Sequence, residues 1–197
     1  MDNQRPATGD LKLYMLLLGS RAPGRHVEQH DYFFGIATSL KELVPDIKAF
    51  WRGAAANIHI DGWRDVKAVS GYAIKIVPKG TVAETSDNKL FFINLGGYQQ
   101  GKLEEQHYVI LSVNKDRAAA IQEAKKAAFF KTNTIAGING ANAHIDDKYG
   151  IDVDDIYRIE EMLIPAHKDK YHIQITPAAD LPEDEIHLGY FRLDKLA

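Results

Sequence analysis

Two short motifs that combine histidine with a carboxylate each occur twice in this chain. Glu-Gln-His stands at residues 28–30 and again at 105–107, and His-Ile-Asp stands at 59–61 and again at 144–146. In a strand, residues two apart lie on one face, so the ionisable side chains of each motif point together. The first motif supplies the candidate ligand-binding residues Glu28, His30, Glu105 and His107. The second motif supplies further candidate pairs, which are His59 with Asp61 and His144 with Asp146.

Each pair is open to more than one interpretation. A glutamate beside a histidine could bind a metal ion or act as an acid–base couple. Alternatively, the histidine has a purely structural role and holds the preceding loop by hydrogen bonds, as many buried polar groups do. We favour the last interpretation, and it predicts that His30 and His107 are largely buried and bonded to their own loops.

A metal site would need both pairs of one repeat. Two histidines and two carboxylates suffice for zinc or manganese. The expected strand faces argue against such a site. His30 shares the apolar face of its strand with Tyr32 and Phe34, whereas His59 is on the face of its strand that points away from Ile60. If both strands belong to one sheet without a bulge, the two pairs point in opposite directions, and no metal site is expected.

A loop bounded by glycines precedes each Glu-Gln-His motif, and a basic residue follows its second glycine. The glycines suit the positive φ angles of a wide hairpin connection, and they are Gly19, Gly24, Gly96 and Gly101. A phosphate-binding loop would need Ser or Thr after the lysine and then a helix, but Lys102 is followed by Leu103 and a strand-like segment. The basic residues Arg25 and Lys102 are candidates for binding an anion, unless they are only solvated surface charges.

The whole neighbourhood of these motifs is repeated. Residues 12–30 align with 89–107 at a constant offset of 77 residues, and the pattern Tyr-x-Ile-x-Ile-x-Pro stands at 72–78 and at 171–177. An internal duplication explains this agreement. We expect a flexible tail at 1–11, a first repeat at 12–78, a connection at 79–88, a second repeat at 89–177 with insertions near 147–151 and 160–170, and an extension with an extra strand at 178–197.

Each repeat reads as strand, strand, helix, strand, strand. The alternation of apolar residues predicts strands, and the run after Asn114 predicts a helix with that residue as its N-cap. In the first repeat Ser39 and Glu42 have the spacing of a capping box, and Pro45 should kink the helix or shift its start. The predicted fold is therefore α+β, with two ββαββ repeats of mostly antiparallel sheet, one main helix per repeat, packed about a pseudo-twofold axis.

The combination of the glycine loop, Glu-Gln-His, a helix, His-Ile-Asp and Tyr-x-Ile resembles a small bacterial family called domain of unknown function 1543. The resemblance covers both repeats, roughly residues 12–78 and 89–177, and the family carries one or two copies of the domain per chain. It implies a bacterial, cytoplasmic protein. It brings no activity, cofactor or catalytic residue with it.

Composition narrows the classes of function. Of the 197 residues, 45% are hydrophobic and 26% are charged, as in a globular protein, and the lack of cysteine excludes thiolate metal sites and cysteine nucleophiles. No stretch is apolar enough for a membrane span, and the N-terminus lacks a signal-peptide core, so we expect cytoplasmic residence and no membrane partner. The net charge of −3 argues against a nucleic-acid partner, although residues 1–145 carry 18 basic and 14 acidic side chains.

From the sequence we therefore expect a non-catalytic binding or assembly module. The alternative is a small-molecule or metal-dependent enzyme that uses the duplicated Glu-x-His pairs. The cofactor, and whether the protein is an enzyme, stay open, and the partner is a small molecule, another protein or a second copy of the chain. Symmetry places any ligand site between the repeats, beside both Glu-x-His pairs and the residues Arg25 and Lys102.

Overall fold

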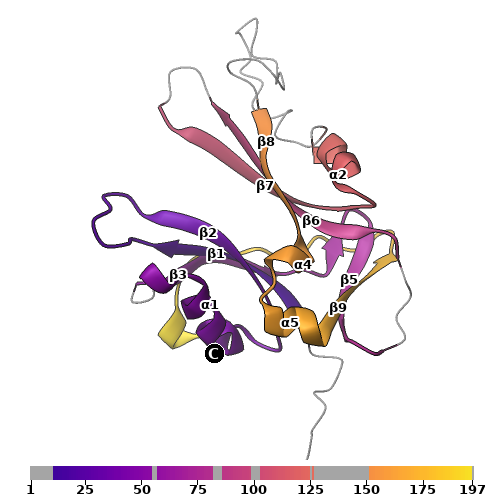
Figure 1. The fold of residues 1–197 in the computed structure, drawn as a ribbon, viewed down its shortest axis with the longest axis horizontal. Coiled ribbons are helices and arrows are strands. Elements are labelled where there is room, and N and C mark those ends of the chain that lie inside the picture. The colour runs from indigo at the N-terminus through magenta and orange to yellow at the C-terminus, as the bar shows by residue number, and fades with distance from the viewer. Residues whose placement is uncertain are drawn as a thin grey trace, which may run out of the picture. The chain divides into compact units, whose positions relative to one another are not determined.

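The structure is a computed structural model that describes residues 11–54, 57–81, 86–98, 103–124, 126 and 151–196. Its contacts divide the chain into two compact units. Unit 1 consists of residues 1–86 and 162–197, and unit 2 consists of residues 87–161. Every strand pair in the described part of the chain is antiparallel, and helices accompany the sheets (Figure 1). The predicted α+β class with mostly antiparallel sheet is confirmed.

The main sheet of unit 1 has the strand order β10-β3-β1-β2. Its strands are β1 (Lys12–Ser20), β2 (Gln29–Ala37), β3 (His59–Asp65) and β10 (His187–Arg192). The central strand β1 is almost continuously apolar, and this composition suits a strand with partners on both edges and cover on both faces. Strand β10 lies within 178–197, where the sequence predicts an extra strand.

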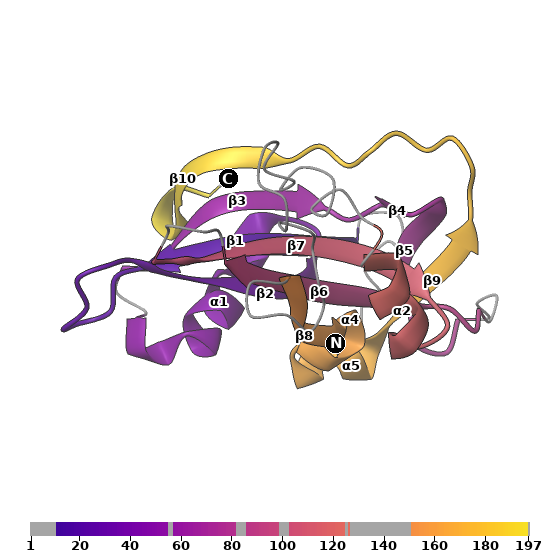
Figure 2. The ribbon, with the colours of Figure 1, turned by 90° about the horizontal axis from the view of Figure 1, so that it is seen from above.

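Helix α1 (Val44–Phe50) covers one face of this sheet (Figure 2). The short 3-10 turns η1 (Leu40–Leu43) and η2 (Arg52–Ala54) flank it. Its Ile47 packs in one core cluster with Leu16, Phe33 and Ile60, all at most 1% exposed. Complete burial of such a side chain contributes roughly 1.5–3 kcal/mol, so this contact holds the helix against the sheet.

The start of this helical segment differs in detail from the sequence prediction. The α-helix begins at Val44 with Pro45 in its first turn, where the missing N–H costs nothing. The predicted shift of the helix start is therefore observed. The predicted capping box is wrong, because Ser39 makes no side-chain cap bond. Instead, Glu42 accepts hydrogen bonds from the backbone N–H and the hydroxyl of Thr38.

A second sheet of unit 1 joins β4 (Ala68–Val69), β5 (Tyr72–Pro78) and β9 (Tyr171–Pro177). The two copies of Tyr-x-Ile-x-Ile-x-Pro pair with each other in this sheet. Tyr72 lies opposite Pro177 and Pro78 lies opposite Tyr171, so the pairing has a local twofold symmetry. The short helices α4 (Ile159–Met162) and α5 (Pro165–Lys170) fall at the predicted insertion near 160–170.

Unit 2 has a sheet with the order β7-β6-β8, formed by β6 (Lys89–Tyr98), β7 (Glu105–Asn114) and β8 (Ile151–Arg158). Helix α2 (Arg117–Ala124) buries Ala120 and Ala124 in the cluster around Ile93. The predicted N-cap at Asn114 is wrong. Asp116 has this role, because its carboxylate accepts a hydrogen bond from the N–H of Ala119 at 2.9 Å.

The main sheet of unit 1 and the sheet of unit 2 share their pairing register. Strand β3 pairs with β1 as β8 pairs with β6, and the register shifts between Leu17 and Leu18 in one and between Asn94 and Leu95 in the other. In this register the strand 151–158 takes the place of β3. The predicted counterpart of its first residues, at 144–146, lies outside the described residues. The duplication itself stays a prediction, with which the shared register agrees.

Among the described helices, none combines the length and the apolar character that are needed to cross a membrane.

Candidate functional site

The strand register of unit 1 brings the two predicted motifs of the first repeat together. Gly19 on β1 lies opposite His30 on β2 and opposite His59 on β3. Directly opposed residues of neighbouring antiparallel strands point to the same face, so both imidazoles flank Gly19 on one face of the sheet. The register shift leaves Asp61 as the extra residue of a β-bulge, beside His59.

The expectation that the two pairs point in opposite directions is therefore wrong. It rested on assigning one apolar face to the strand that carries His30. In fact the neighbouring residues Phe33 and Phe34 are both buried, so this strand is covered on both faces. Hydrophobicity alone does not distinguish two covered faces.

Glu28, His30, His59 and Asp61 form what we call the histidine–carboxylate cluster. The Nε2 atom of His59 lies 3.1 Å from Oδ1 of Asp61 and 3.3 Å from Oε1 of Glu28. The Nε2 atom of His30 lies 3.1 Å from Oδ2 of Asp61 and 3.9 Å from Oε2 of Glu28. Each imidazole thus contacts both carboxylates.

The members of the cluster differ in burial. The side chain of His59 is only 5% exposed, whereas those of His30, Glu28 and Asp61 are 47%, 40% and 26% exposed. The prediction that His30 is largely buried and bonded to its glycine loop is wrong. The cluster has one deep member and an accessible outer side.

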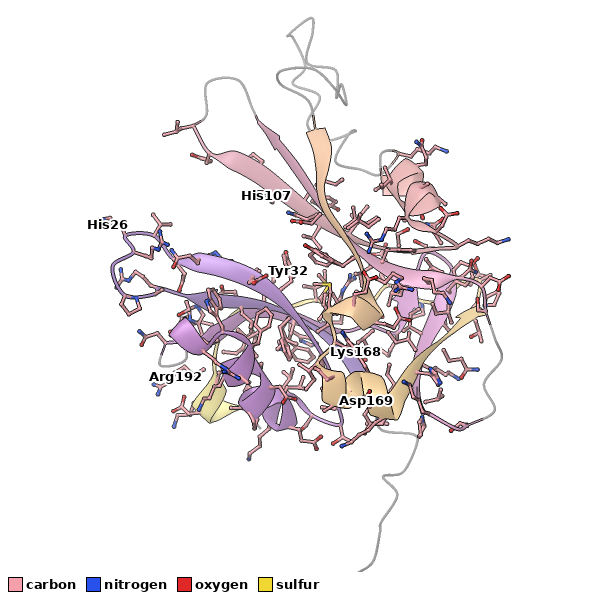
Figure 3. All side chains as sticks on the ribbon, viewed as in Figure 1. His26, Tyr32, His107, Lys168, Asp169 and Arg192 are labelled. Atoms are coloured by element: carbon pink, nitrogen blue, oxygen red, sulfur yellow. The ribbon has the colours of Figure 1, made fainter. Side chains whose placement is uncertain are left out.

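The burial predicted for His107 in unit 2 is also wrong, whereas its bonding to the loop before it, of which residues 99–102 lie outside the described part, stays a prediction. This residue lies on β7 and is exposed (Figure 3), and its Nδ1 atom lies 3.4 Å from the side-chain nitrogen of Asn94. Glu105 also lies on β7. The remaining candidates of the second repeat, which are Gly101, Lys102, His144 and Asp146, lie outside the described residues.

His59 is held from two further sides. Its Nδ1 atom lies 3.3 Å from the carbonyl oxygen of Asn57. The ring of Tyr190, on β10, packs against the imidazole with ring centroids 4.1 Å apart. Tyr190 is itself 69% exposed, so most of its surface remains accessible. The imidazole of His59 is therefore fixed in orientation while its Nε2 atom faces the carboxylates.

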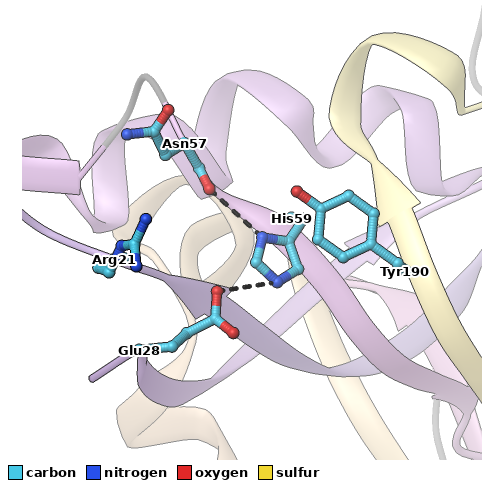
Figure 4. Close-up of a pocket in the computed structure, with 5 residues that line it drawn as sticks. All are labelled: Arg21, Glu28, Asn57, His59 and Tyr190. Carbon is cyan, nitrogen blue, oxygen red and sulfur yellow. Dashed lines mark hydrogen bonds and ion pairs between the residues drawn. The ribbon is translucent and has the colours of Figure 1, made fainter. Parts of the chain in front are cut away.

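A cavity of about 400 Å³ opens beside this histidine (Figure 4). Its lining combines one cation, one carboxylate, an amide, an imidazole and an aromatic ring, supplied by Arg21, Glu28, Asn57, His59 and Tyr190. Sequence reasoning selected only the glutamate and the histidine. It missed Tyr190 because β10 and β3 are distant in sequence, and no local pattern reports their pairing. It favoured Arg25, which is exposed and does not line the cavity.

The glycines of the first loop have different roles. Gly24 adopts a φ of 77°, as predicted for a wide hairpin connection. Gly19 instead provides space, because a Cβ atom there would lie 2.5 Å from Oδ2 of Asp61 and 2.6 Å from Nε2 of His59. Only glycine fits at this position without displacing the cluster. Its counterpart Gly96 lies in β6, opposite His107.

The fold and this site define an α+β protein that carries a histidine–carboxylate cluster at the polar end of an antiparallel sheet. Residues 25–76 match the family model described as Domain of Unknown Function (DUF1543), a segment that contains all four cluster residues. The resemblance inferred from the sequence is thereby confirmed over this segment, and its extension to residues 89–177 stays a prediction.

A solved structure shares the fold. Protein Il1583 from Idiomarina loihiensis is 20% identical, with a TM-score of 0.62 over 94% of this chain and 99% of that chain. At this identity the likeness concerns the fold alone. No curated protein matches the chain.

Proposed function

We propose that this protein is a binding module for a small organic anion, which it takes up in the cavity beside His59. A volume of about 400 Å³ is within the range of small-molecule pockets. The observation that carries the proposal is the convergence of Arg21, Tyr190 and His59 on one cavity. A guanidinium group recognises carboxylate or phosphate, and an exposed tyrosine ring offers a stacking surface.

The ligand class follows from this lining. Among the described residues, no carboxylate forms an ion pair with Arg21, so its charge is available to an anion. The aromatic rings of Tyr190 and His59 favour a ligand with a flat, unsaturated framework. An aromatic or otherwise planar carboxylate satisfies both requirements.

Benzoate tests the proposal, with neutral benzamide as the matched ligand. We expect benzoate to shift the amide resonances around Arg21 and Tyr190 of the metal-free full chain in a saturable titration. Arg21→Gln should weaken benzoate binding by about tenfold or more, because hydrogen bonds to charged groups are among the strong ones. Arg25→Gln, in the same loop but outside the cavity, is the matched control. Equal binding of benzamide, or equal effects of both variants, would contradict the proposal.

A second candidate function is acid–base catalysis on such a ligand. The contact of 3.3 Å between Nε2 of His59 and Oε1 of Glu28 favours it, since a general base needs a partner within hydrogen-bond reach. Hydrolysis of an aromatic compound that carries both a free carboxylate and an ester group tests this function. Loss of this hydrolysis in Glu28→Gln would distinguish catalysis from binding. The site between the repeats, homo-oligomerisation, a bacterial source and cytoplasmic residence stay predictions from the sequence.

A further inference from the structure

The imidazole of His59 lies between acceptor oxygens on both of its nitrogen sides. The carbonyl oxygen of Asn57 can only accept a hydrogen bond, so the Nδ1 atom that lies 3.3 Å from it carries the proton. In the neutral imidazole the Nε2 atom then presents a lone pair. This lone pair faces carboxylate oxygens of Asp61 and Glu28 at 3.1 and 3.3 Å. A metal cation placed between this lone pair and the carboxylate oxygens would bind both.

The contacts of Asp61 also favour a cation at this place. It offers one oxygen to each imidazole, Oδ1 to His59 and Oδ2 to His30, both at 3.1 Å. The Oδ2 atom is buried, and none of the described residues makes a hydrogen bond to it, although Nε2 of His30 lies 3.1 Å away. A buried acceptor without a donor is costly, and a cation between the two residues would satisfy it.

The spacing of the four groups suits one small cation. Zinc binds nitrogen and oxygen ligands at about 2.0–2.2 Å, which places neighbouring ligands of a tetrahedron roughly 3.3–3.5 Å apart. The four contacts of the cluster join the two imidazole nitrogens to four different carboxylate oxygens at 3.1, 3.1, 3.3 and 3.9 Å, so a tetrahedral ion would take one oxygen from each carboxylate after these side chains adjust. Gly19 keeps the space between the two rings open, since a Cβ atom would lie 2.6 Å from Nε2 of His59.

We propose that Glu28, His30, His59 and Asp61 bind one divalent cation, with zinc preferred. Two imidazoles favour zinc over magnesium or calcium, and two carboxylates balance its charge. The bond from Nδ1 of His59 to the Asn57 carbonyl is the kind of outer contact that orients a metal-binding histidine.

Among the described residues, no group of three or more His, Cys, Asp or Glu side chains is placed so that it could hold a metal ion without moving. The imidazoles contact the carboxylates directly, and a cation would take the place of these contacts. Glu28 and His30 are the accessible members that can adjust. Glu28 and His59 belong both to the cluster and to the cavity lining, so metal binding and anion binding are measured on separate samples.

Isothermal titration of the chelator-treated full chain with zinc chloride, and separately with manganese chloride, tests the proposal. We expect zinc to bind more tightly than manganese, with loss of one zinc site in His30→Gln and in Asp61→Asn. Each variant should weaken zinc binding by more than the roughly 10–100-fold that loss of an outer contact causes. His107→Gln, at the corresponding place on β7, is the matched control and should bind zinc as the wild type does.

Cobalt(II) gives a second readout that does not depend on affinity. A tetrahedral site of two nitrogen and two oxygen ligands gives visible absorption bands, which His30→Gln should lose while circular dichroism shows that the variant is folded. Wild-type zinc affinity in both His30→Gln and Asp61→Asn, equal loss in His107→Gln, or no saturable zinc binding would overturn the proposal. Because benzoate binding is measured without metal, the two proposals fail separately.

Discussion

The sheet β3-β1-β2 and the sheet β8-β6-β7 have the same strand order, the same hairpin register and a register shift at the same place, but their polar ends differ. In unit 1 the row across the strands is His30, Gly19 and His59. In unit 2 the corresponding row is His107, Gly96 and Asp152. One backbone frame thus carries two imidazoles in one case and one imidazole in the other. The comparison teaches that the frame only creates adjacent positions, and that the residues placed there decide the chemistry.

The largest effect is expected where the frame of unit 1 makes room for the cluster. Gly19→Ala places a Cβ atom against Asp61 and the buried His59. We expect the unfolding free energy to fall by about 3 kcal/mol, which is the upper end of the usual cost of overpacking a core. We also expect zinc binding to be lost. Chemical denaturation and zinc titration measure both. Gly53→Ala is the control, because nothing lies within 4 Å of its added Cβ atom. Wild-type zinc affinity in Gly19→Ala would refute the role assigned to this glycine.

The next effect concerns the extra strand of the unit 1 sheet. Asp184, in the segment before β10, accepts hydrogen bonds from the backbone N–H groups of Lys67 and Ala68 at about 3.1 Å. Asp184→Ala leaves both donors without this partner, and we expect a loss of about 1–2 kcal/mol of unfolding free energy.

Asp184→Asn separates the hydrogen bonds from the charge. Burial raises the pKa of Asp184, against the lowering by these amides and by Arg64, so the fold favours the neutral carboxyl. The wild type should therefore gain stability relative to Asp184→Asn as the pH falls through the range where this carboxyl titrates. Asp184→Asn should cost much less than Asp184→Ala at neutral pH. Equal losses in both variants would show that the hydrogen bonds contribute nothing.

A smaller effect distinguishes the two main helices. Helix α2 of unit 2 has a side-chain cap from Asp116, whereas α1 of unit 1 has none and begins with proline instead. Asp116→Ala should lower the unfolding free energy by about 1 kcal/mol. The substitution Asp46→Ala in the first turn of α1 should cost less, because no cap bond is lost. Denaturant unfolding of both variants measures the difference, and a larger loss in Asp46→Ala would reverse the comparison.

The smallest effect is expected from pH. Burial lowers the pKa of His167 below its usual 6.5, against the opposing charge of Asp46, and its Nδ1 atom accepts the N–H of Ile36 at 3.3 Å. A lowered pKa means that this stability is present above the unfolded-state pKa and is lost as the pH falls through it. The stability difference between the wild type and His167→Gln should therefore shrink on acidification. The exposed His107 is the control, and an equal pH dependence in His107→Gln would contradict this explanation.

Much of the fold follows from the sequence, because apolar alternation and glycine-bounded turns act locally. The class and the hairpins were predictable for this reason. The helix caps were not, since Ser39, Asn114 and Asp116 are all acceptable cap residues and only the backbone geometry selects among them. Matching letters do not report strand register, so the sequence did not predict that Asp152 pairs with Gly96 as His59 pairs with Gly19.

The candidate site was predictable in its residues but not in its assembly. All four cluster residues stood out by type and spacing. Their convergence depended on a strand with two covered faces and on a bulge at Asp61, neither of which has a local signature. Arg21, Asn57 and Tyr190 were missed because tertiary pairing alone brings them to the cavity.

The location of bound zinc tests the central claim most directly. Crystals of the full chain with one equivalent of zinc, measured at the zinc absorption edge, should give an anomalous difference peak about 2.0–2.1 Å from Nε2 of both His30 and His59. Oxygen atoms of Glu28 and Asp61 should complete its coordination. An absent peak at the cluster, or a peak only beside His107 in unit 2, would contradict the claim that unit 1 assembles a metal site on this frame.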